Sequence, residues 1–209
     1  MHVFFAFFPL AYTVLFTAIF NNYGLVLPTE NEIQNPSLLL DLVYQNSVTY
    51  IKTTPSVLKM ILKVDHDIIK EKLKSLKFIF IGGEPINYFD VQQLYSICKD
   101  IKIINHYGPC ETTIGCCMID MQSINNSEDV SIGQPFGDNK VDIVDENLNQ
   151  VQDGESGRLL IYGPGVSDGY INFDNKNFMN YKGQKAFLTE DIGVVDKNNN
   201  IKLVGRTND

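Results

Sequence analysis

The chain has 209 residues, of which 44% are hydrophobic and 20% are charged. This length is sufficient to bury a core and to form one large or two small domains. Lys and Arg together number 17 against 25 Asp and Glu, which gives a formal net charge of -8. An acidic chain lacks the even basic coating on which general nucleic-acid binding depends, so we expect no nucleic-acid partner.

The four cysteines, at positions 98, 110, 116 and 117, include two neighbours but no Cys-x-x-Cys pair. This spacing suits neither a disulfide framework nor a tetrahedral zinc site. His106 lies near them and is a conceivable zinc ligand, but buried free thiols are commoner than metal sites with such irregular spacing. We therefore expect free thiols in a reducing, cytoplasmic compartment.

Elements are predicted in chain order from the strongly apolar run Val3–Phe20, which is long enough to span a bilayer. The run lacks the basic lead-in and the small-residue cleavage site of a signal peptide, and the segment after it is typical of a buried strand. We predict a core helix over residues 3–20 and no membrane partner. An apolar start without a polar cap is also what a chain cut from a larger domain would show.

Strands are predicted to alternate with helices between residues 35 and 113. The apolar runs Val48–Ile51, Phe78–Ile81 and Ile101–Ile104 are typical of buried strands. The helices expected between them begin at Asn35-Pro36-Ser37, at Thr53-Thr54-Pro55-Ser56, at Asp67 and at Asp90. Such alternation indicates a parallel sheet.

The composition changes after residue 125. Short alternating runs, among them Lys140–Val144 and Arg158–Tyr162, are separated by turn-forming residues, and residues 198–200 are predicted to form a hairpin turn. The predicted fold class is α/β: part of a parallel-sheet α/β subdomain over residues 1–125, followed by a smaller antiparallel β subdomain over residues 126–209.

Candidate functional residues follow the predicted parallel strands, where open α/β sheets bind their ligands. The segment Gly82–Pro85 contains two glycines that let backbone approach a flat or phosphorylated ligand. Tyr107 is suited to stacking on a purine, and Glu111 is a hard oxygen ligand for a divalent cation. From these residues alone, paired glycines equally serve a tight turn, and Tyr107 equally packs in a core.

Two further candidates lie near the C-terminal end. Asp191 offers a carboxylate to a ribose diol, and Arg206 offers a guanidinium to a nucleotide. Taken singly, each residue is more often a solvated surface charge.

Together and in this order, the segments resemble the adenylate-forming superfamily, and most closely the adenylation domains of nonribosomal peptide synthetases. Residues 105–113, NHYGPCETT, are similar to that family's Asn-x-Tyr-Gly-Pro-Thr-Glu-Thr-Thr. Residues 163–172, GPGVSDGYIN, are similar to its Gly-x-Gly-Val-x-x-Gly-Tyr-x-Asn. Shorter family motifs are resembled by Thr53–Ser56, Gly82–Glu84, Ile132–Pro135 and Gly205-Arg206.

The resemblance implies ATP-dependent activation of a small carboxylic acid, with an amino acid as the first candidate. The carboxylate attacks the α-phosphorus, pyrophosphate leaves, and the acyl-adenylate passes to the phosphopantetheine thiol of a partner carrier domain. ATP and Mg²⁺ are the implied cofactors. An acyl-CoA or aryl-acid ligase remains an alternative within the same chemistry, and a non-catalytic remnant remains an alternative outside it.

The resemblance also implies which residues form the site. Glu111 would hold Mg²⁺ and, with Thr112, would be catalytic. The implied nucleotide-binding residues are Gly83, Glu84, Pro85, Asn105, His106, Tyr107, Gly108, Pro109, Asp191 and Arg206. The implied acid-binding residues are Thr13, Gly82, His106 and Ile114.

Departures from the family pattern occur at both ends and inside the chain. The Ser/Thr/Gly-rich phosphate loop and the lysine-bearing lid of the family have no counterpart here, which predicts a central fragment that needs those N-terminal and lid segments and is inactive alone. Cys110 replaces the usual Thr. Glu190 replaces a Gly beside the ribose-binding Asp191, which predicts a distorted turn or repulsion of phosphate. Thr13 stands where amino-acid-activating members carry an Asp for the substrate ammonium, so either the acid lacks an α-amino group or the pocket has decayed.

Overall fold

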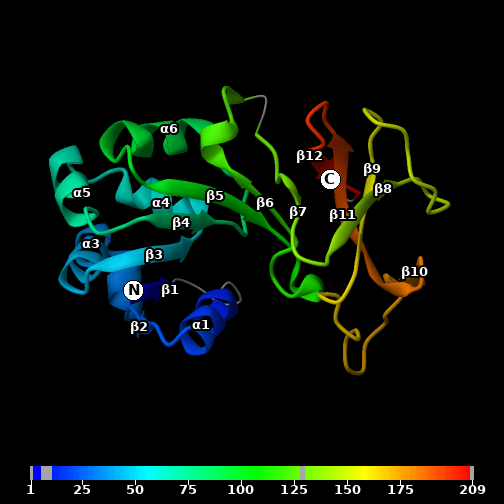
Figure 1. Ribbon diagram of the computed structural model, residues 1–209, viewed down its shortest axis with the longest axis horizontal. Helices are drawn as coiled ribbons and strands as arrows, with labels where there is room; N and C mark the ends of the chain where they lie inside the picture. The colour runs from blue at the N-terminus through cyan, green and yellow to red at the C-terminus, as the bar shows by residue number, and fades with distance from the viewer. Residues whose placement is uncertain (1, 6–10, 128–129, 208–209) are drawn as a thin grey trace. The chain divides into compact units, whose positions relative to one another are not determined.

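The computed structural model describes residues 2–5, 11–127 and 130–207 (Figure 1). The chain forms two compact units. The first comprises Met1–Asn105 and Asp120–Val130, and the second comprises His106–Ile119 and Ser131–Asp209. The predicted subdomain limits, 1–125 and 126–209, stay a prediction.

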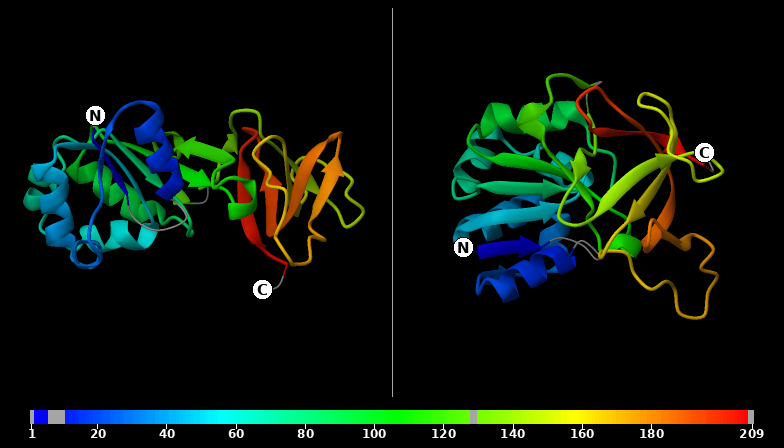
Figure 2. Two further views of the ribbon diagram at one scale, coloured as in Figure 1. Left: turned by 90° about the horizontal axis from the view of Figure 1, so that it is seen from below. Right: turned by 45° about the vertical axis from the view of Figure 1, so that its right-hand side comes forward.

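A parallel sheet forms the centre of the first unit, with helices on both of its faces (Figure 2). Its strand order is β2-β1-β3-β4-β5, and each neighbouring pair is parallel. The strands are β1 (His2–Phe5), β2 (Gly24–Val26), β3 (Val48–Thr53), β4 (Phe78–Ile81) and β5 (Lys102–Tyr107). The last two residues of β5 belong to the second unit.

Six α-helices are described in the first unit, and short-range capping fixes where several of them begin. They are α1 (Ala11–Phe20), α2 (Glu30–Gln34), α3 (Pro36–Gln45), α4 (Pro55–Ile61), α5 (His66–Lys72) and α6 (Tyr88–Ile97). The predicted start of α3 is confirmed, because Asn35 Oδ1 accepts a hydrogen bond from the backbone N–H of Ser37 at 3.0 Å. The predicted cap of α5 is wrong: Asp65 accepts from the N–H of Asp67 at 2.9 Å, so Asp67 lies inside the first turn.

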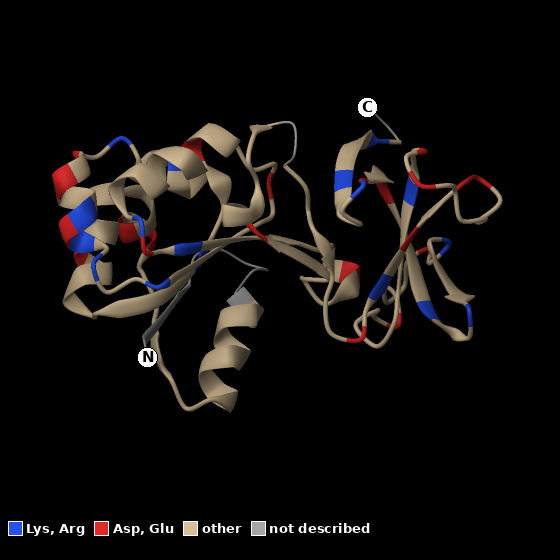
Figure 3. Cartoon of the chain, turned by 45° about the horizontal axis from the view of Figure 1, so that its top comes forward, with Lys and Arg blue, Asp and Glu red and all other residues tan. Residues whose placement is uncertain are grey.

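The predicted core helix over residues 3–20 is also wrong. Residues 2–5 form β1, which pairs with β2 and β3, and α1 begins only at Ala11; residues 6–10 lie outside the described part of the chain. Val14 is buried, but Phe20 is 81% exposed, and α1 carries no charged residue (Figure 3). No helix among the described residues has the length and apolar character needed to cross a membrane.

The second unit is dominated by antiparallel strands. Its main sheet has the order β10-β11-β9-β8, with β12 paired to β11. The strands of this unit are β6 (Cys117–Asp120), β7 (Gln134–Pro135), β8 (Lys140–Val144), β9 (Gly157–Tyr162), β10 (Phe178–Tyr181), β11 (Gln184–Val195) and β12 (Ile201–Arg206). The last residue of β6 belongs to the first unit. Of two 3₁₀ turns, η1 (Cys110–Thr112) lies in the second unit and η2 (Met121–Ser123) lies in the first. The predicted hairpin turn at residues 198–200 is confirmed, because it joins β11 to β12. The α/β fold class with a following antiparallel β part is confirmed as well.

Cysteines contribute to the core of the second unit. Cys116 and Cys117 are fully buried and pack with Leu159, Ile161 and neighbouring apolar residues. All four cysteines are free thiols. Residues 106–119 therefore group with the second unit because their end is part of its core.

Candidate functional site

A tight loop follows β5 and carries the first long motif. Cys116 closes the loop by donating its N–H to the Tyr107 carbonyl at 2.8 Å. A Cβ on Gly108 would lie 2.7 Å from the Ile114 carbonyl oxygen, and a Cβ on Gly115 would lie 2.0 Å from the His106 ring. Since contacts below 3 Å are not sterically allowed, the loop needs glycine at both positions.

Backbone strain is concentrated in this loop. Thr113 has φ 58° and Ile114 has φ 75°, in the left-handed region. This conformation is unfavourable for a β-branched residue, and such strain persists where surrounding structure enforces it, often at functional sites. Ile114 is one of the residues expected in the acid pocket.

The two long motifs contact each other in the second unit. The N–H of Ser167 donates to the Glu111 carbonyl at 2.8 Å, and the Thr113 hydroxyl donates to the Gly165 carbonyl at 2.5 Å. The Tyr170 hydroxyl donates to the Glu111 carboxylate, and this hydrogen bond is the main reason why the pKa of Tyr170 is raised to about 12. Segments more than 50 residues apart thus position the candidate Mg²⁺ ligand together.

Asp191 is held between two other predicted nucleotide-binding residues. The Tyr107 hydroxyl donates to Asp191 Oδ2 at 2.5 Å, and Arg206 Nε lies 3.2 Å from Asp191 Oδ1. Asp191 on β11 and Arg206 on β12 are register partners, so the antiparallel pairing itself brings the two side chains together. Burial, followed by the hydrogen bond to Asp191, raises the pKa of Tyr107 well above its usual range.

Glu190 is accommodated beside this group without left-handed backbone strain. Its φ lies outside the left-handed region, although the register of β11 is irregular between Leu188 and Ile192. Its Oε2 lies 3.5 Å from the Arg206 guanidinium, and both side chains are about half exposed. We expected that Glu190, in place of a glycine, would distort the turn, but its backbone shows no left-handed strain. The expected repulsion of phosphate by Glu190 stays a prediction.

Glu84 has a clear structural task in the first unit. Its Oε2 accepts from the Ser56 N–H at 3.0 Å and from the Ser56 hydroxyl at 2.5 Å. Thr54, the N-cap residue of α4, makes no side-chain cap hydrogen bond. Glu84 thus satisfies the N-terminus of α4 from 28 residues away, and the carboxylate also complements the helix dipole.

Replacing Glu84 with alanine is expected to lower the free energy of unfolding by about 1 kcal/mol, the usual cost of losing a helix cap. Urea denaturation followed by circular dichroism would measure this loss. Glu146→Ala, at an exposed position, should change stability by less than about 0.5 kcal/mol. Equal stability of the two variants would show that Glu84 does not cap α4.

The remaining predicted residues divide between the units. Thr13, Gly82, Gly83 and Pro85 lie in the first unit with buried Asn105, whereas His106, Gly108, Pro109, Thr112 and Ile114 lie in the second. The buried His106 ring has its centroid 5.6 Å from that of Phe136. Thr112 is fully buried, and its hydroxyl donates to the Pro109 carbonyl at 3.1 Å, which ties the loop to itself.

Sequence reasoning missed three residues that the structure ties to the predicted ones. Ser56 is the partner of Glu84, Tyr170 is the partner of Glu111, and Lys52 donates a hydrogen bond to Thr13 Oγ1 at 3.2 Å. Ser56 and Tyr170 stand inside recognised motifs but had no role assigned. The only sequence signal for Lys52 is a charge within the otherwise uncharged strand β3, VTYIKT.

Glu111 is compatible with Mg²⁺. Mg²⁺ usually takes one or two protein carboxylates and completes its shell with water and substrate phosphates. Among the residues that the structure describes, no group of three or more His, Cys, Asp or Glu could hold a metal ion. A single carboxylate on a positioned loop therefore fits a metal that arrives with a phosphorylated ligand.

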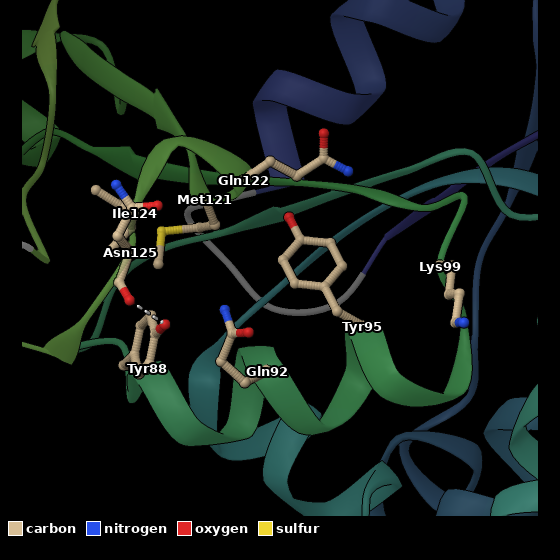
Figure 4. A pocket seen from close by; sticks show the side chains of 8 residues that line it. All are labelled: Tyr88, Gln92, Tyr95, Lys99, Met121, Gln122, Ile124 and Asn125. Atoms are coloured by element: carbon tan, nitrogen blue, oxygen red, sulfur yellow. Dashed lines mark hydrogen bonds between the residues drawn. The ribbon is translucent and has the colours of Figure 1, made fainter.

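A separate pocket of about 460 Å³ lies in the first unit (Figure 4). Its lining comes from α6, from Lys99 just after that helix and from the segment after β6, and none of the predicted site residues contributes to it. Two of the lining residues are joined by a hydrogen bond, which the Tyr88 hydroxyl donates to the Asn125 carbonyl at 2.9 Å. The lining residues are Tyr88, Gln92, Tyr95, Lys99, Met121, Gln122, Ile124 and Asn125.

Comparison with known families decides what kind of protein carries this site. The family model described as AMP-binding enzyme matches residues 2–171. The chain belongs to the AMP-binding enzyme family. Its membership confirms the resemblance read from the motifs at residues 105–113 and 163–172.

Curated relatives of this AMP-binding chain are much longer than the chain itself. It is 30% identical over 208 residues to bacitracin synthase 3 from Bacillus licheniformis, which covers 95% of this chain and 3% of that protein. It is 33% identical over 159 residues to the D-alanine–D-alanyl carrier protein ligase of Streptococcus pyogenes serotype M3 (strain SSI-1), covering 74% of this chain and 31% of the ligase. The chain thus spans about a third or less of these relatives.

Solved structures share the fold. A nonribosomal peptide synthetase protein with adenylation and PCP domains, bound to a vinylsulfonamide inhibitor, superposes with a TM-score of 0.84 at 21% identity, covering 99% of this chain and 37% of that one. IdnL1 superposes with a TM-score of 0.90 at 17% identity, covering 99% of this chain and 45% of the other.

Proposed function

We propose that this chain is part of an enzyme that activates a small carboxylic acid, with an amino acid as the first candidate, by forming an acyl-adenylate from ATP in the presence of Mg²⁺. The observation that carries the proposal is the group formed by Tyr107, Asp191 and Arg206 within one unit of an AMP-binding chain. Enzymes of this family use ATP, and the Tyr107 ring beside the Asp191 carboxylate suits the adenine base and the ribose hydroxyls of that nucleotide.

In this proposal the carboxylate of Asp191 accepts hydrogen bonds from the two ribose hydroxyls. Arg206 offsets the negative charge of Asp191, and the Tyr107 hydroxyl fixes its orientation. The Tyr107 ring offers a stacking surface for adenine, and the backbone of His106 meets its edge. Gly108 and Pro109 set the turn that presents the ring.

Glu111 would hold Mg²⁺ in the proposed enzyme. When bound, Mg²⁺ would supply positive charge that stabilises the negative charge developing on the oxygens of the attacked phosphate and of the leaving pyrophosphate. Tyr170 fixes the Glu111 carboxylate by a hydrogen bond, and Thr112 fixes the loop beneath it through the Pro109 carbonyl. Preorganisation of this kind lowers the reorganisation needed during the reaction.

The acceptor of the acyl group in this proposal is the phosphopantetheine thiol of a partner carrier domain, in nonribosomal peptide synthesis. Support comes from the relatives: one is a bacitracin synthase, one is a ligase for a D-alanyl carrier protein, and one superposable structure contains a PCP domain. Residues 1–125 and 126–209 would be the α/β and β-rich parts of the adenylation core. Free thiols such as Cys116 and Cys117 suit a cytoplasmic enzyme.

The test is acid-dependent exchange of labelled pyrophosphate into ATP, measured with the full-length gene product and a panel of amino acids, aryl acids and fatty acids. We expect exchange with at least one acid and none without acid. We also expect no exchange by the 209-residue chain alone, because the segment of it that matches the D-alanyl carrier protein ligase covers only 31% of that enzyme. A folded full-length protein without exchange for any acid would contradict the proposal.

A further inference from the structure

A single side chain, that of Asn175, fixes the backbone of Tyr170 in the loop between β9 and β10. Asn175 Oδ1 accepts a hydrogen bond from the Tyr170 N–H at 2.7 Å, and Asn175 Nδ2 donates to the Tyr170 carbonyl at 3.1 Å. Both polar groups of the amide are therefore used on one residue. The Tyr170 backbone is paired on both of its hydrogen-bonding groups although it belongs to no strand.

The residues around Asn175 fit this amide closely. A Cβ on Gly169 would lie 2.7 Å from Asn175 Oδ1, and Gly169 has φ 108°, so the approach of the amide needs glycine there. The carbonyl of Asn175 accepts from the N–H of Phe178, the first residue of β10, at 2.9 Å. Asn175 thus ties the loop both to Tyr170 and to the start of the next strand.

The Tyr170 ring is supported from the sheet as well. It meets the Phe178 ring edge-on, with ring centroids 5.5 Å apart, and the Phe178 ring lies 4.8 Å from that of Phe187 on β11. Phe178 and Phe187 are register partners in the sheet, and Phe187 is buried. Edge-on aromatic pairs contribute more than their buried area alone, so this contact restricts the Tyr170 side chain while Asn175 restricts its backbone.

The group that both contacts position is the Tyr170 hydroxyl, which donates to Oε1 of Glu111. The backbone of Glu111 is fixed independently, because its carbonyl accepts from the Ser167 N–H at 2.8 Å. Within the part of the chain that the structure describes, no hydrogen bond or ion pair reaches Oε2 of Glu111. One carboxylate oxygen is thus oriented by the protein, and the other is available to a ligand.

An exposed tyrosine needs such support if it is to orient another side chain. Tyr170 is 47% exposed, and ordering an exposed loop and a mobile side chain costs conformational entropy. The contacts of Asn175 and Phe178 remove this freedom before any ligand binds. Hydrogen-bond partners of a metal-binding carboxylate, although they do not touch the metal, contribute strongly to metal affinity because they hold the ligand in place.

We infer that Asn175 is a positioning residue for the metal site: by fixing Tyr170, it holds the Tyr170 hydroxyl on Oε1 of Glu111 and leaves Oε2 to bind Mg²⁺. This inference rests on the proposed function of the chain. Asn175 lies beyond the end of the motif at residues 163–172, so the motif gives no indication of this role.

The inference is tested by calorimetric titration of the full-length gene product with ATP, once with Mg²⁺ and once with EDTA. By linkage, the ratio of the two ATP affinities equals the Mg²⁺ affinity of protein-bound ATP divided by that of free ATP. A purely structural loss lowers both ATP affinities together and leaves the ratio unchanged. We expect the wild type to bind ATP at least about tenfold more tightly with Mg²⁺, and Asn175→Ala to lower this ratio by about tenfold. Asn147→Ala, at an exposed turn of the same unit, should keep the ratio of the wild type.

A double-mutant cycle shows whether Asn175 acts through Tyr170. Tyr170→Phe removes the hydroxyl that donates to Glu111 and keeps the ring that packs on Phe178. It should lower the ratio about as much as Asn175→Ala does. Adding Asn175→Ala to Tyr170→Phe should then cause no further fall, because the contact that Asn175 supports is already lost.

The outcomes separate this inference from the proposed function. An unchanged ratio in Asn175→Ala, a further fall when it is added to Tyr170→Phe, or a wild type whose ATP affinity does not depend on Mg²⁺ overturns the inference while ATP binding stands. A folded wild type that binds no ATP contradicts both. Should Asn175→Ala not fold, Asn175→Asp replaces it, since it keeps the acceptor for the Tyr170 N–H and loses the donor: a ratio lowered by at least about threefold supports the inference, and an unchanged ratio contradicts it.

Discussion

Replacing Gly115 with alanine is expected to lower the free energy of unfolding by about 3 kcal/mol, at the upper end of the usual cost of overpacking. The new Cβ would lie 2.0 Å from Cε1 of His106. The His106 ring is only 5% exposed and packs near Phe136, so it cannot move away without disturbing other contacts. Because the chain has no tryptophan, urea-induced unfolding followed by circular dichroism is the suitable measurement.

Gly205→Ala is the matched control for this substitution. A Cβ at Gly205 would have no atom within 4 Å, and its φ lies outside the left-handed region. We expect a change in unfolding free energy of less than about 0.5 kcal/mol. Equal stability of the two variants would contradict the close packing of His106 on the loop that carries Glu111.

The second large effect is expected from Lys52→Met, which should raise the free energy of unfolding at pH 7 by about 3 kcal/mol, because a pKa lowered from 10.5 to about 8 corresponds to a penalty of that order for the buried ammonium. Methionine fills a similar volume without a charge.

The same residue predicts how stability depends on pH. Below pH 8 Lys52 is protonated in both the folded and the unfolded chain, so the full penalty applies. Between pH 8 and 10.5 the folded chain loses this proton first, and the Lys52 contribution to stability rises with pH. Comparing wild type with Lys52→Met at pH 7 and pH 10 isolates this contribution: the amount by which the variant is more stable than the wild type should shrink at the higher pH.

Lys77→Met serves as the control, because Lys77 is exposed. Its stability should follow that of the wild type across the pH range within about 0.5 kcal/mol. A difference between wild type and Lys52→Met that stays constant from pH 7 to pH 10 would show that burial does not disfavour the charged form of Lys52.

Local signals in the sequence predicted the elements that depend on local interactions. β4 and β8 have the bounds expected from their apolar patterns, and Asn35 caps α3 as its position before proline indicates. The helix predicted over residues 3–20 from the same kind of signal was wrong. An unbroken apolar run has no period, and β1 owes its strand conformation to parallel pairing on both sides, which is not a local property.

The site was predictable in its order along the chain but not in its contacts. The motif spacing indicated that Tyr107 and Asp191 belong to one site, although 84 residues separate them. Which oxygen meets which donor depends on the pairing of β11 with β12 and on the loop after β5. The cap that Glu84 supplies to α4 was not predictable, because a cap from a distant segment leaves no local pattern, while the role of Glu84 at a ligand stays a prediction. Lys52 was missed because a single lysine usually indicates an exposed position.

Calorimetric titration of the 209-residue chain with ATP and Mg²⁺ tests the central claim most directly. We predict binding by the wild type, at least about tenfold weaker binding by Asp191→Ala, and a smaller loss in Tyr107→Phe, which removes the hydrogen bond to Asp191. Asp153→Ala, at an exposed turn of the same unit, should bind as the wild type does. Absence of binding by the folded wild type, or equal binding by Asp191→Ala, would contradict the assignment of this site to a nucleotide.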